Sequence, residues 1–320
     1  MNVRRPQVTQ PQQPLLVVVG PTGSGKSALA IHLARQFGGE IVNCDSLQLY
    51  RGFDIGTAKT PPAQRGGIPH HLFDVLTPLE SYSAGEYARL ARTVIAEIAA
   101  RGQLPVVVGG TGFYLRALLE GLPPLPARDP QLRDRLMARE EARPGSLHRI
   151  LSRLDPTAAA RIHIHDVRKT LRALELRLLT RKSLPPVESA QALQGYSVFK
   201  LGLDPDRAAL HKKLEARTRE MFAHGLIEEV EGLLRSGCTG EEKPFESLGC
   251  KQALAHLRGS LTREQAIEST LIETRQYAKR QWTWFRRDPE IHWLKGFGDE
   301  SEVQEQAEAL VEAHFNLARR

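Results

Sequence analysis

The stretch Leu15-Leu16-Val17-Val18-Val19 runs directly into Gly20-Pro21-Thr22-Gly23-Ser24-Gly25-Lys26-Ser27. The apolar run is typical of a buried strand, and an apolar-periodic helix is predicted to follow it from Ser27 to Phe37. The glycines let the backbone turn sharply, so that successive N–H groups and a helix N-terminus face an anion. Lys26 adds a positive charge, and the Ser27 hydroxyl is placed to ligate Mg²⁺. The pattern predicts a diphosphate-binding loop but does not say which reaction the loop serves.

The composition narrows the class of protein. A chain of 320 residues can bury a large core, and 25% charged residues with 41% hydrophobic ones favour a soluble globular protein. No apolar run approaches the roughly 18 residues that span a bilayer, and residues 1–13 lack the apolar centre of a signal peptide. The three cysteines are an odd number without metal-ligand spacing. They fit a reducing, cytoplasmic environment, and no membrane contact is expected.

Positive charge gathers in two stretches of the chain. The formal net charge of +7 is by itself only a mild hint of a polyanionic partner. From Arg275 to Arg287, however, there are five Lys or Arg residues and no acid, interleaved with aromatic side chains. Seven more lie between Arg161 and Lys182. On a helix, Arg275, Lys279 and Arg286 fall on one stripe and Gln276, Arg280 and Arg287 on the next, which predicts a broad basic face.

Short apolar strands alternate with amphipathic helices in the first third of the chain. Strands are predicted at residues 15–19, 40–44 and 105–108, and Ser83 with Glu86 predicts a capping box that opens a helix. This alternation predicts an α/β fold with a P-loop NTPase-like parallel sheet flanked by helices. Asp45 and Thr111 follow two of the strands. Since ligand groups gather at the carboxyl ends of parallel strands, both are expected beside the loop.

The chain is predicted to contain a helical insertion. Residues 1–13 read as a disordered tail and 14–121 as the first part of the catalytic core. Prolines then precede long helical patterns that Pro185 and Pro186 end, which predicts an insertion over 122–196. Residues 197–320 are expected to return to the core, with a strand at 198–203, helices over 206–235, a strand at 291–294 and a helix at 303–317.

A phosphate loop leaves several reactions open, and a small-molecule kinase is one of them. Phosphoryl transfer in such proteins usually uses an aspartate at the end of an apolar strand to hold Mg²⁺. Here the strand at 105–108 runs into Gly109-Gly110-Thr111-Gly112, which contains no acid. The missing aspartate makes a kinase less well supported but does not exclude one.

A series of motifs resembles the tRNA dimethylallyltransferases, also called tRNA isopentenyltransferases. The resemblance covers nearly the whole chain and rests on the segments 20–27, 45–50, 54–59, 69–72, 82–85, 109–114, 160–163, 172–175 and 274–281. It implies transfer of a dimethylallyl group from dimethylallyl diphosphate to N6 of the adenosine at tRNA position 37, with Mg²⁺. The expected partners are the tRNA anticodon stem-loop and dimethylallyl diphosphate, and the expected state is a monomer.

The chemistry that this reaction needs can be matched to residues. An exocyclic adenine amine is a poor nucleophile, so a base that removes its proton assists the attack, and Asp45 is the candidate. The loop and Lys26 would stabilise the leaving diphosphate. The resemblance further implies that Thr111 orients the base or the amine and that Arg217 reaches the diphosphate. Thr111 also suits a helix N-cap, and Arg217 an exposed helix face, so both structural interpretations stay open.

The candidate tRNA-contacting residues form the largest predicted set. The resemblance and the basic stripes together give Asp45, Ser46, Leu47, Gln48, Thr111, Arg133, Arg168, Lys169, Thr170, Leu171, Arg172, Ser247, Lys251, Arg275, Gln276, Lys279 and Arg280.

The chain departs from the family pattern at two positions. Cys250 stands where an aromatic residue is frequent, which would remove a stacking platform, and His165 stands where Asn is common. Asp54 and Lys59 belong to one of the matching segments but are not assigned a role, since a solvated loop charge is an equally simple interpretation of each.

Three alternatives to the tRNA enzyme remain at this point. They are a dimethylallyltransferase acting on free adenylate, the small-molecule kinase, and a non-enzymatic RNA-binding module that would leave Lys26, Ser27 and Asp45 unused.

Overall fold

The computed structural model describes residues 12–123, 125–126, 128–181 and 191–319, which fall into two compact units. The larger unit joins the residues up to Leu119 with those from Leu193 onward, and the smaller is Glu120–Ala192. The tail expected over 1–13 lies outside the described residues as far as residue 11. Gln13 is not part of a tail, because it opens the first strand.

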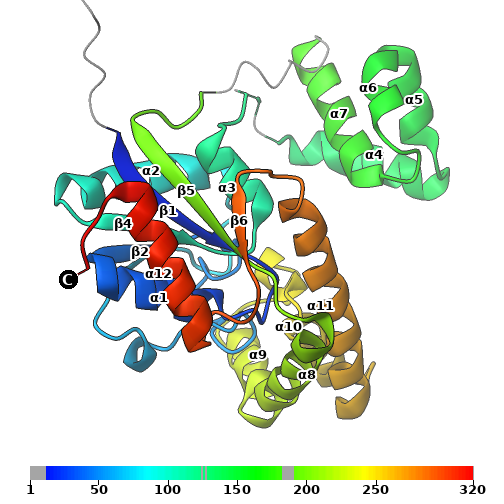
Figure 1. The fold of residues 1–320 in the computed structure, drawn as a ribbon. Coiled ribbons are helices and arrows are strands. Elements are labelled where there is room, and N and C mark those ends of the chain that lie inside the picture. Colours follow the sequence, from blue (N-terminus) through cyan, green and yellow to red (C-terminus); the bar gives the residue numbers. More distant parts are fainter. Residues whose placement is uncertain (1–11, 124, 127, 182–190, 320) are drawn as a thin grey trace, which may run out of the picture. The chain divides into compact units, whose positions relative to one another are not determined.

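A six-stranded parallel sheet in the order β3-β2-β4-β1-β5-β6 forms the centre of the larger unit (Figure 1). β1 pairs with β4 on one side and with β5 on the other, so its apolar residues are buried. This explains the continuous apolar run rather than an alternating one. The strands are β1 Gln13–Val19, β2 Gly39–Asn43, β3 His70–His71, β4 Leu104–Val108, β5 Tyr196–Leu203 and β6 Ile291–Leu294.

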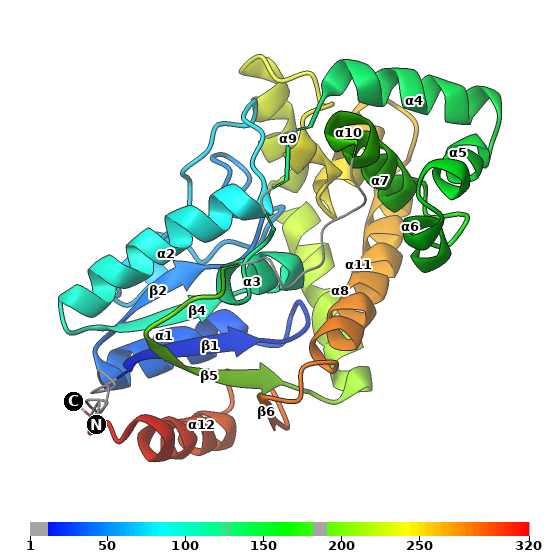
Figure 2. The same cartoon turned by 90° about the horizontal axis from the view of Figure 1, so that it is seen from above.

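Helices cover both faces of the sheet (Figures 1 and 2). One core cluster joins Leu16 and Val18 of the sheet to Leu29 and Leu33 of α1 and to Val303 of α12. The α2 and α3 helices pack together on the other face. The helices of this unit are α1 Lys26–Phe37, α2 Ala84–Ala100, α3 Gly112–Leu119, α8 Arg207–Ala223, α9 Leu226–Arg235, α10 Cys250–Leu257, α11 Arg263–Phe285 and α12 Ser301–Phe315, with 3₁₀ turns at Pro62–Gln64 and Lys243–Glu246.

Local signals set the helix ends. The predicted capping box is present, because the Ser83 N–H donates to Glu86 at 2.7 Å and the Glu86 N–H donates to the Ser83 hydroxyl at 3.2 Å. Gly38 ends α1 with φ 61°, and Gly225 separates α8 from α9 with φ 107°. Both torsions are left-handed, a conformation that glycine adopts without strain. In the larger unit, the predicted helix boundaries agree with the structure within one or two residues.

The smaller unit is helical and has its own core. Its helices are α4 Pro130–Ala142, α5 Ser146–Leu154, α6 Pro156–Arg161 and α7 Val167–Thr180. Leu136, Leu147, Leu151 and Leu174 meet in one buried cluster. The helical pattern was predicted to continue to Pro185 and Pro186, but α7 ends at Thr180, where Arg181 takes a left-handed conformation with φ 57°; the two prolines lie outside the described residues. In the parts of both units that the structure describes, no helix combines the length and apolar character needed to cross a bilayer.

The backbones of the segments that follow β2 and β4 are in direct contact. The Cys44 N–H donates to the Val108 carbonyl at 2.8 Å, and the Thr111 N–H donates to the Cys44 carbonyl at 3.2 Å. A Cβ atom on Gly109 would lie 2.1 Å from the Cys44 carbonyl oxygen. Glycine is therefore required at position 109 for this close approach.

We predict that Gly109→Ala destabilises the larger unit by about 1–3 kcal/mol, because the methyl group would force two backbone segments apart. Urea unfolding followed by tryptophan fluorescence measures this, since Trp282, Trp284 and Trp293 all lie in the larger unit. Gly232→Ala is the control, because Gly232 lies in α9 and an added methyl group there would have nothing within 4 Å. Equal unfolding midpoints for the two variants would contradict the prediction.

Candidate active site

The predicted phosphate loop connects β1 to α1, and its glycines carry the unusual torsions. Gly20, Gly23 and Gly25 have φ values of 144°, 80° and 85°. Gly25 stands at the N-cap of α1 and has no side chain to occupy the first amides of the helix. Since no side chain caps these amides, they could donate to an anion bound in the loop.

Lys26 turns back over the loop. Its Nζ donates to the Pro21 carbonyl at 2.8 Å. Burial lowers the pKa of Lys26 to about 8, although the Asp45 carboxylate favours the charged form, and the neighbouring Arg217 lowers the pKa further. An anion bound in the loop would favour the protonated ammonium, so anion binding and proton uptake at Lys26 are coupled.

Arg217 reaches the loop from α8. Its Nη2 donates to the Thr22 hydroxyl at 2.9 Å, and burial lowers the pKa of the guanidinium. Its Nε is buried and has no hydrogen-bond partner among the described residues. The α8 helix is held close to the loop because Gly23 has no side chain: a Cβ at position 23 would lie 2.7 Å from Leu214. Arg217 therefore lies at the loop and not on an exposed helix face.

Asp45 follows β2 and is held by Asn43. The Asn43 Oδ1 accepts from the Asp45 N–H at 2.9 Å, and its Nδ2 donates to the Asp45 carbonyl at 3.1 Å. The carboxylate accepts from the Leu47 N–H at 2.9 Å. Burial raises the pKa of Asp45, while the Leu47 N–H and the Lys26 charge partly oppose the rise. A carboxylate with a raised pKa is a better base near neutral pH.

Thr111 faces the segment that carries Asp45. Its Oγ1 accepts from the Ser46 N–H at 3.1 Å and lies 3.5 Å from the Ser46 hydroxyl. The first amides of α3, on Tyr114 and Leu115, bond instead to the Thr111 backbone carbonyl. The side chain thus connects two active-site loops, and these bonds do not support the N-cap interpretation.

Two further residues of the site, Tyr277 and Gln281, come from α11. Neither was predicted from the sequence to lie in the catalytic site. Gln281 bonds to both the phosphate loop and the Gly109–Gly112 loop. Burial raises the pKa of Tyr277 well above its usual range, with a further rise from the Asp45 charge, and its hydroxyl lies near Thr111 and Gln281. Both residues lie inside the basic, aromatic stretch from Arg275 to Arg287. That stretch predicts an RNA-binding surface and contains no separate signal for a polar residue in the catalytic site.

A charged network supports the loop after Asp45. The Glu229 carboxylate accepts from the N–H groups of Asp54, Ile55 and Gly56 at 2.7–3.0 Å. Lys59 is buried and pairs with Asp54 at 2.8 Å and Asp74 at 2.5 Å, which excludes a solvated loop charge at this position.

The predicted RNA-contacting residues in the loop after Asp45 already make hydrogen bonds within the protein. Gln48 uses its amide nitrogen to bond the Thr57 carbonyl at 2.9 Å. Ser46 and Leu47 donate their N–H groups to Thr111 and Asp45.

The predicted RNA-contacting residues of α11 divide between two sides of the helix. Gln276, Lys279, Arg280, Thr283, Trp284 and Arg287 line a cavity of about 560 Å³. Among the described residues, its cations make no ion pair. Arg275 lies elsewhere, 3.5 Å from Glu215.

Residues near α10 are placed differently from expectation. Cys250 is fully buried, and its Sγ lies 2.1 Å from where a Cβ of Gly56 would stand. An aromatic ring would not fit there, so position 250 is a packing position in this chain and not a stacking platform. Ser247 is buried as well, whereas Lys251 is exposed and pairs with Glu273 at 3.4 Å. Burial raises the pKa of the Cys44 and Cys250 thiols to about 12, which makes both poor nucleophiles.

In the insertion, several predicted RNA contacts point inward. Arg133 and Arg172 both pair with the buried Glu175 carboxylate, at 3.1 and 2.6 Å. Thr170 and Leu171 are 1% and 4% exposed and belong to the interior. Arg168 and Lys169 remain on the surface, although Lys169 pairs with Asp166 at 2.7 Å.

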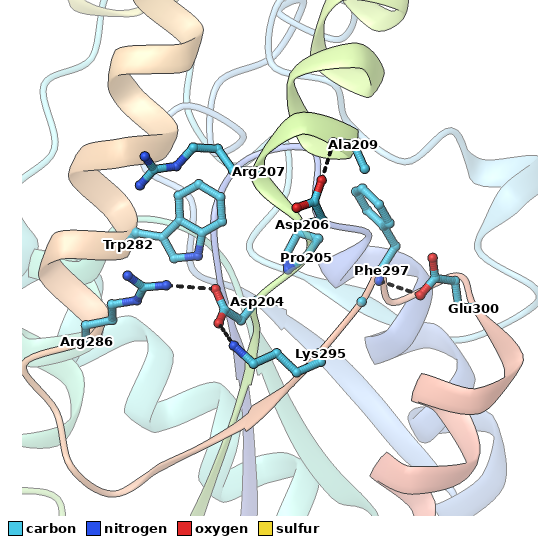
Figure 3. Close-up of a pocket in the computed structure, with 11 residues that line it drawn as sticks. Asp204, Pro205, Asp206, Arg207, Ala209, Trp282, Arg286, Lys295, Phe297 and Glu300 are labelled. Atoms are coloured by element: carbon cyan, nitrogen blue, oxygen red, sulfur yellow. Dashed lines mark hydrogen bonds and ion pairs between the residues drawn. The ribbon is translucent and has the colours of Figure 1, made fainter.

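A second cavity of about 560 Å³ lies in the larger unit, at the ends of β5 and β6 (Figure 3). Arg286 and Lys295 both bond the Asp204 carboxylate there, and Arg207 and Arg286 lie 5.9 and 5.8 Å from the Trp282 ring centre. Arg286 therefore leaves the basic stripe predicted for it. Because the cavity shares no lining residue with the loop, Asp45 or Thr111, it is separate from the candidate active site.

The residues around the loop suit Mg²⁺ bound mainly through phosphate oxygens. Ser27 is exposed in the first turn of α1. Within the described part of the chain, no group of three or more His, Cys, Asp or Glu side chains could hold a metal ion. Mg²⁺ commonly keeps several waters and takes one or two protein ligands beside substrate phosphates, and one hydroxyl fits that pattern.

Known proteins resemble this chain over most of its length. Residues 48–288 match the family described as IPP transferase, and residues 13–67 match the one described as isopentenyl transferase. A protein of Solibacter usitatus named tRNA dimethylallyltransferase is 58% identical over 92% of this chain and 96% of its own length. A protein of the same name from Koribacter versatilis is 52% identical over 93% of this chain and 97% of its own length.

Solved structures agree with this. The full-length tRNA isopentenylpyrophosphate transferase of Bacillus halodurans has a TM-score of 0.70 and 34% identity, covering 95% of this chain and 99% of its own. A eukaryotic dimethylallyltransferase described as acting on tRNA has a TM-score of 0.77 and 30% identity. The match covers 95% of this chain and 79% of the other. The chain belongs to the IPP transferase family.

We predict that the affinity for inorganic diphosphate falls as pH rises through about 8, because Lys26 loses its charge with a pKa of about 8. Isothermal titration calorimetry from pH 7 to 9 measures this. Lys26→Arg is the control, since arginine stays charged over this range and the ligand's own titration is common to both proteins. Parallel pH profiles for the two proteins would contradict the assignment.

Proposed function

We propose that this chain transfers a dimethylallyl group from dimethylallyl diphosphate to N6 of the adenosine at position 37 of tRNA and releases diphosphate. Family membership and the names of its relatives support tRNA dimethylallyl transfer. The observation that carries the chemistry is that the half-buried Asp45 carboxylate faces the same site as the Lys26 ammonium, so that the charge of each favours the charged form of the other. A base and a leaving-group site thus share one region.

In the proposed reaction, the N6 nitrogen attacks the first carbon of the allyl group. The bond between that carbon and the diphosphate oxygen breaks, and its electron pair leaves with the diphosphate. Asp45 accepts the proton that N6 loses as the new bond forms. Thr111 would keep the amine and the carboxylate aligned, because its hydroxyl already bonds the segment that carries Asp45.

The loop amides, Lys26 and the half-buried guanidinium of Arg217 would stabilise the negative charge that develops on the diphosphate. The Ser27 hydroxyl would hold Mg²⁺, which supplies further positive charge to the diphosphate oxygens when bound. The loop thus holds a leaving group, whereas a kinase would hold a phosphoryl donor there.

The adenine must leave the anticodon-loop stack to reach Asp45, at a cost of a few kcal/mol. The cavity of Lys279, Arg280 and Arg287 supports an RNA substrate, since its cations are free of ion pairs among the described residues. Arg133 and Arg172 are better explained as partners of Glu175. In the insertion, Arg168 and Lys169 remain the candidates for phosphate contacts.

Because tRNA is the substrate and one chain supplies every proposed catalytic group, we propose a cytoplasmic, monomeric enzyme.

We predict that wild-type protein, given unmodified tRNA, Mg²⁺ and dimethylallyl diphosphate, adds five carbons to one adenosine, detected by mass spectrometry of digested RNA. Asp45→Asn should lower the turnover by about 10²–10⁴, because the amide cannot accept the proton. It should still bind inorganic diphosphate. Asp134→Asn, on the exposed side of α4, is the matched control.

The outcome separates the remaining functions. Product with AMP but not with tRNA would indicate the free-adenylate enzyme, and ATP consumption without allyl transfer would indicate the kinase. Undiminished transfer by Asp45→Asn would remove Asp45 as the base.

We predict that Lys279→Gln reduces the slope of log affinity against log salt for tRNA by about 0.7, the value for one neutralised phosphate on a single strand. Filter binding between 50 and 200 mM salt measures the slope. Arg235→Gln, at the exposed end of α9, should leave it unchanged. An identical slope for Lys279→Gln would mean that this ammonium neutralises no phosphate.

A further inference from the structure

Gln281 occupies a central position that the proposed mechanism has not used. It projects from α11, and the residue is 5% exposed. Its Oε1 accepts from the Thr22 N–H at 2.7 Å, and its Nε2 donates to the Gly110 carbonyl at 2.9 Å. One side-chain amide therefore joins two loops that lie 259 and 171 residues away in sequence.

Each bond reaches a loop with a proposed role. Thr22 belongs to the diphosphate loop, and its hydroxyl accepts from Arg217. Gly110 precedes Thr111, whose hydroxyl bonds the segment after Asp45. Gln281 thus lies between the group that receives the leaving diphosphate and the group that receives the proton.

The contact requires both a donor and an acceptor in the side chain at 281, and glycine at 110. Only a side chain with both an acceptor and a donor can bond an N–H and a carbonyl at once. A Cβ on Gly110 would lie 2.1 Å from the Gln281 Nε2, so any larger residue would displace the amide. Since the Thr22 N–H is already bonded, it is not available to the diphosphate in this arrangement.

We propose that Gln281 is a positioning residue that fixes the distance between the diphosphate loop and the loop of Thr111 and Asp45. This rests on the proposed function, because it assigns the two loops to leaving group and base. In this role Gln281 needs no contact with either substrate. It acts through the backbone of Thr22 and Gly110.

The test compares Gln281→Glu and Gln281→Leu with the wild type. Glutamate keeps an acceptor for Thr22 but cannot donate to Gly110, and leucine does neither. We expect kcat to fall at least about tenfold in both, since buried polar groups lose their partners. Affinity for inorganic diphosphate should fall most for leucine. Affinity for tRNA should stay within about twofold, and Glu268→Gln, an exposed change on α11, is the control.

A second set of variants separates positioning from a general loss of folding. Gly110→Ala should reproduce the kcat defect by displacing the amide, and Gln281→Ala should make room for the added methyl group. The double variant is therefore expected to be no worse than the poorer single variant, whereas independent effects would multiply. Thermal melting of each variant shows whether it remains folded.

The outcomes are distinct. Unchanged kcat and diphosphate affinity in Gln281→Glu and Gln281→Leu would overturn the proposal, and so would a loss confined to tRNA affinity, which would make Gln281 an RNA contact. Multiplying defects in the double variant would also overturn it. Diphosphate binding by calorimetry needs no transfer reaction, so these results stay interpretable even if the wild type proves to act on another acceptor.

Discussion

The opposite charges of Asp45 and Lys26, both half-buried, are the interaction on which the site depends. Burial alone would favour a neutral carboxyl and a neutral amine. Each group counteracts this for the other, which keeps a base and a cation available at the same pH. The sheet order makes the pairing possible, because the loops after β1, β4 and β2 emerge at the same edge from neighbouring strands.

Close backbone approach is the second requirement. Gly109 lies against the Cys44 carbonyl, Gly110 against Gln281, and Gly112 against the Trp284 indole, where a Cβ would lie 2.1 Å from each nearest atom. Three neighbouring glycines thus allow a loop to be enclosed by β2 on one side and α11 on the other. Side chains in this loop would separate the elements that carry the base and the leaving-group site.

Much of this architecture could be predicted from local sequence. The phosphate loop, the Ser83–Glu86 capping box, and the helix ends at Gly38 and Gly225 depend on neighbouring residues, and so their signals are contained in short segments. The two-residue β3 had no comparable signal, since it is defined by its pairing with β2.

The remaining features depend on tertiary contacts that one sequence does not display. A surface arginine and one bound to a buried carboxylate look alike until Glu175 is seen between Arg133 and Arg172. Likewise, Asn43 and Gln281 are ordinary polar residues in the sequence. Their importance comes from their hydrogen-bond partners, which are the Asp45 backbone for Asn43 and the backbone of Thr22 and Gly110 for Gln281. Helical periodicity placed Arg286 on a basic stripe, but Asp204, distant in sequence, draws it to the other side.

The division of the chain has a consequence for its biosynthesis. The insertion is continuous in sequence, so all four of its helices are available as soon as that stretch leaves the ribosome. The larger unit is discontinuous, because β1 pairs with β4 from before the insertion and with β5 from after it. Domains generally form as units during N-to-C synthesis. The phosphate loop, although among the first segments made, must wait for Arg217 and Gln281 from the last third of the chain before its surroundings are complete.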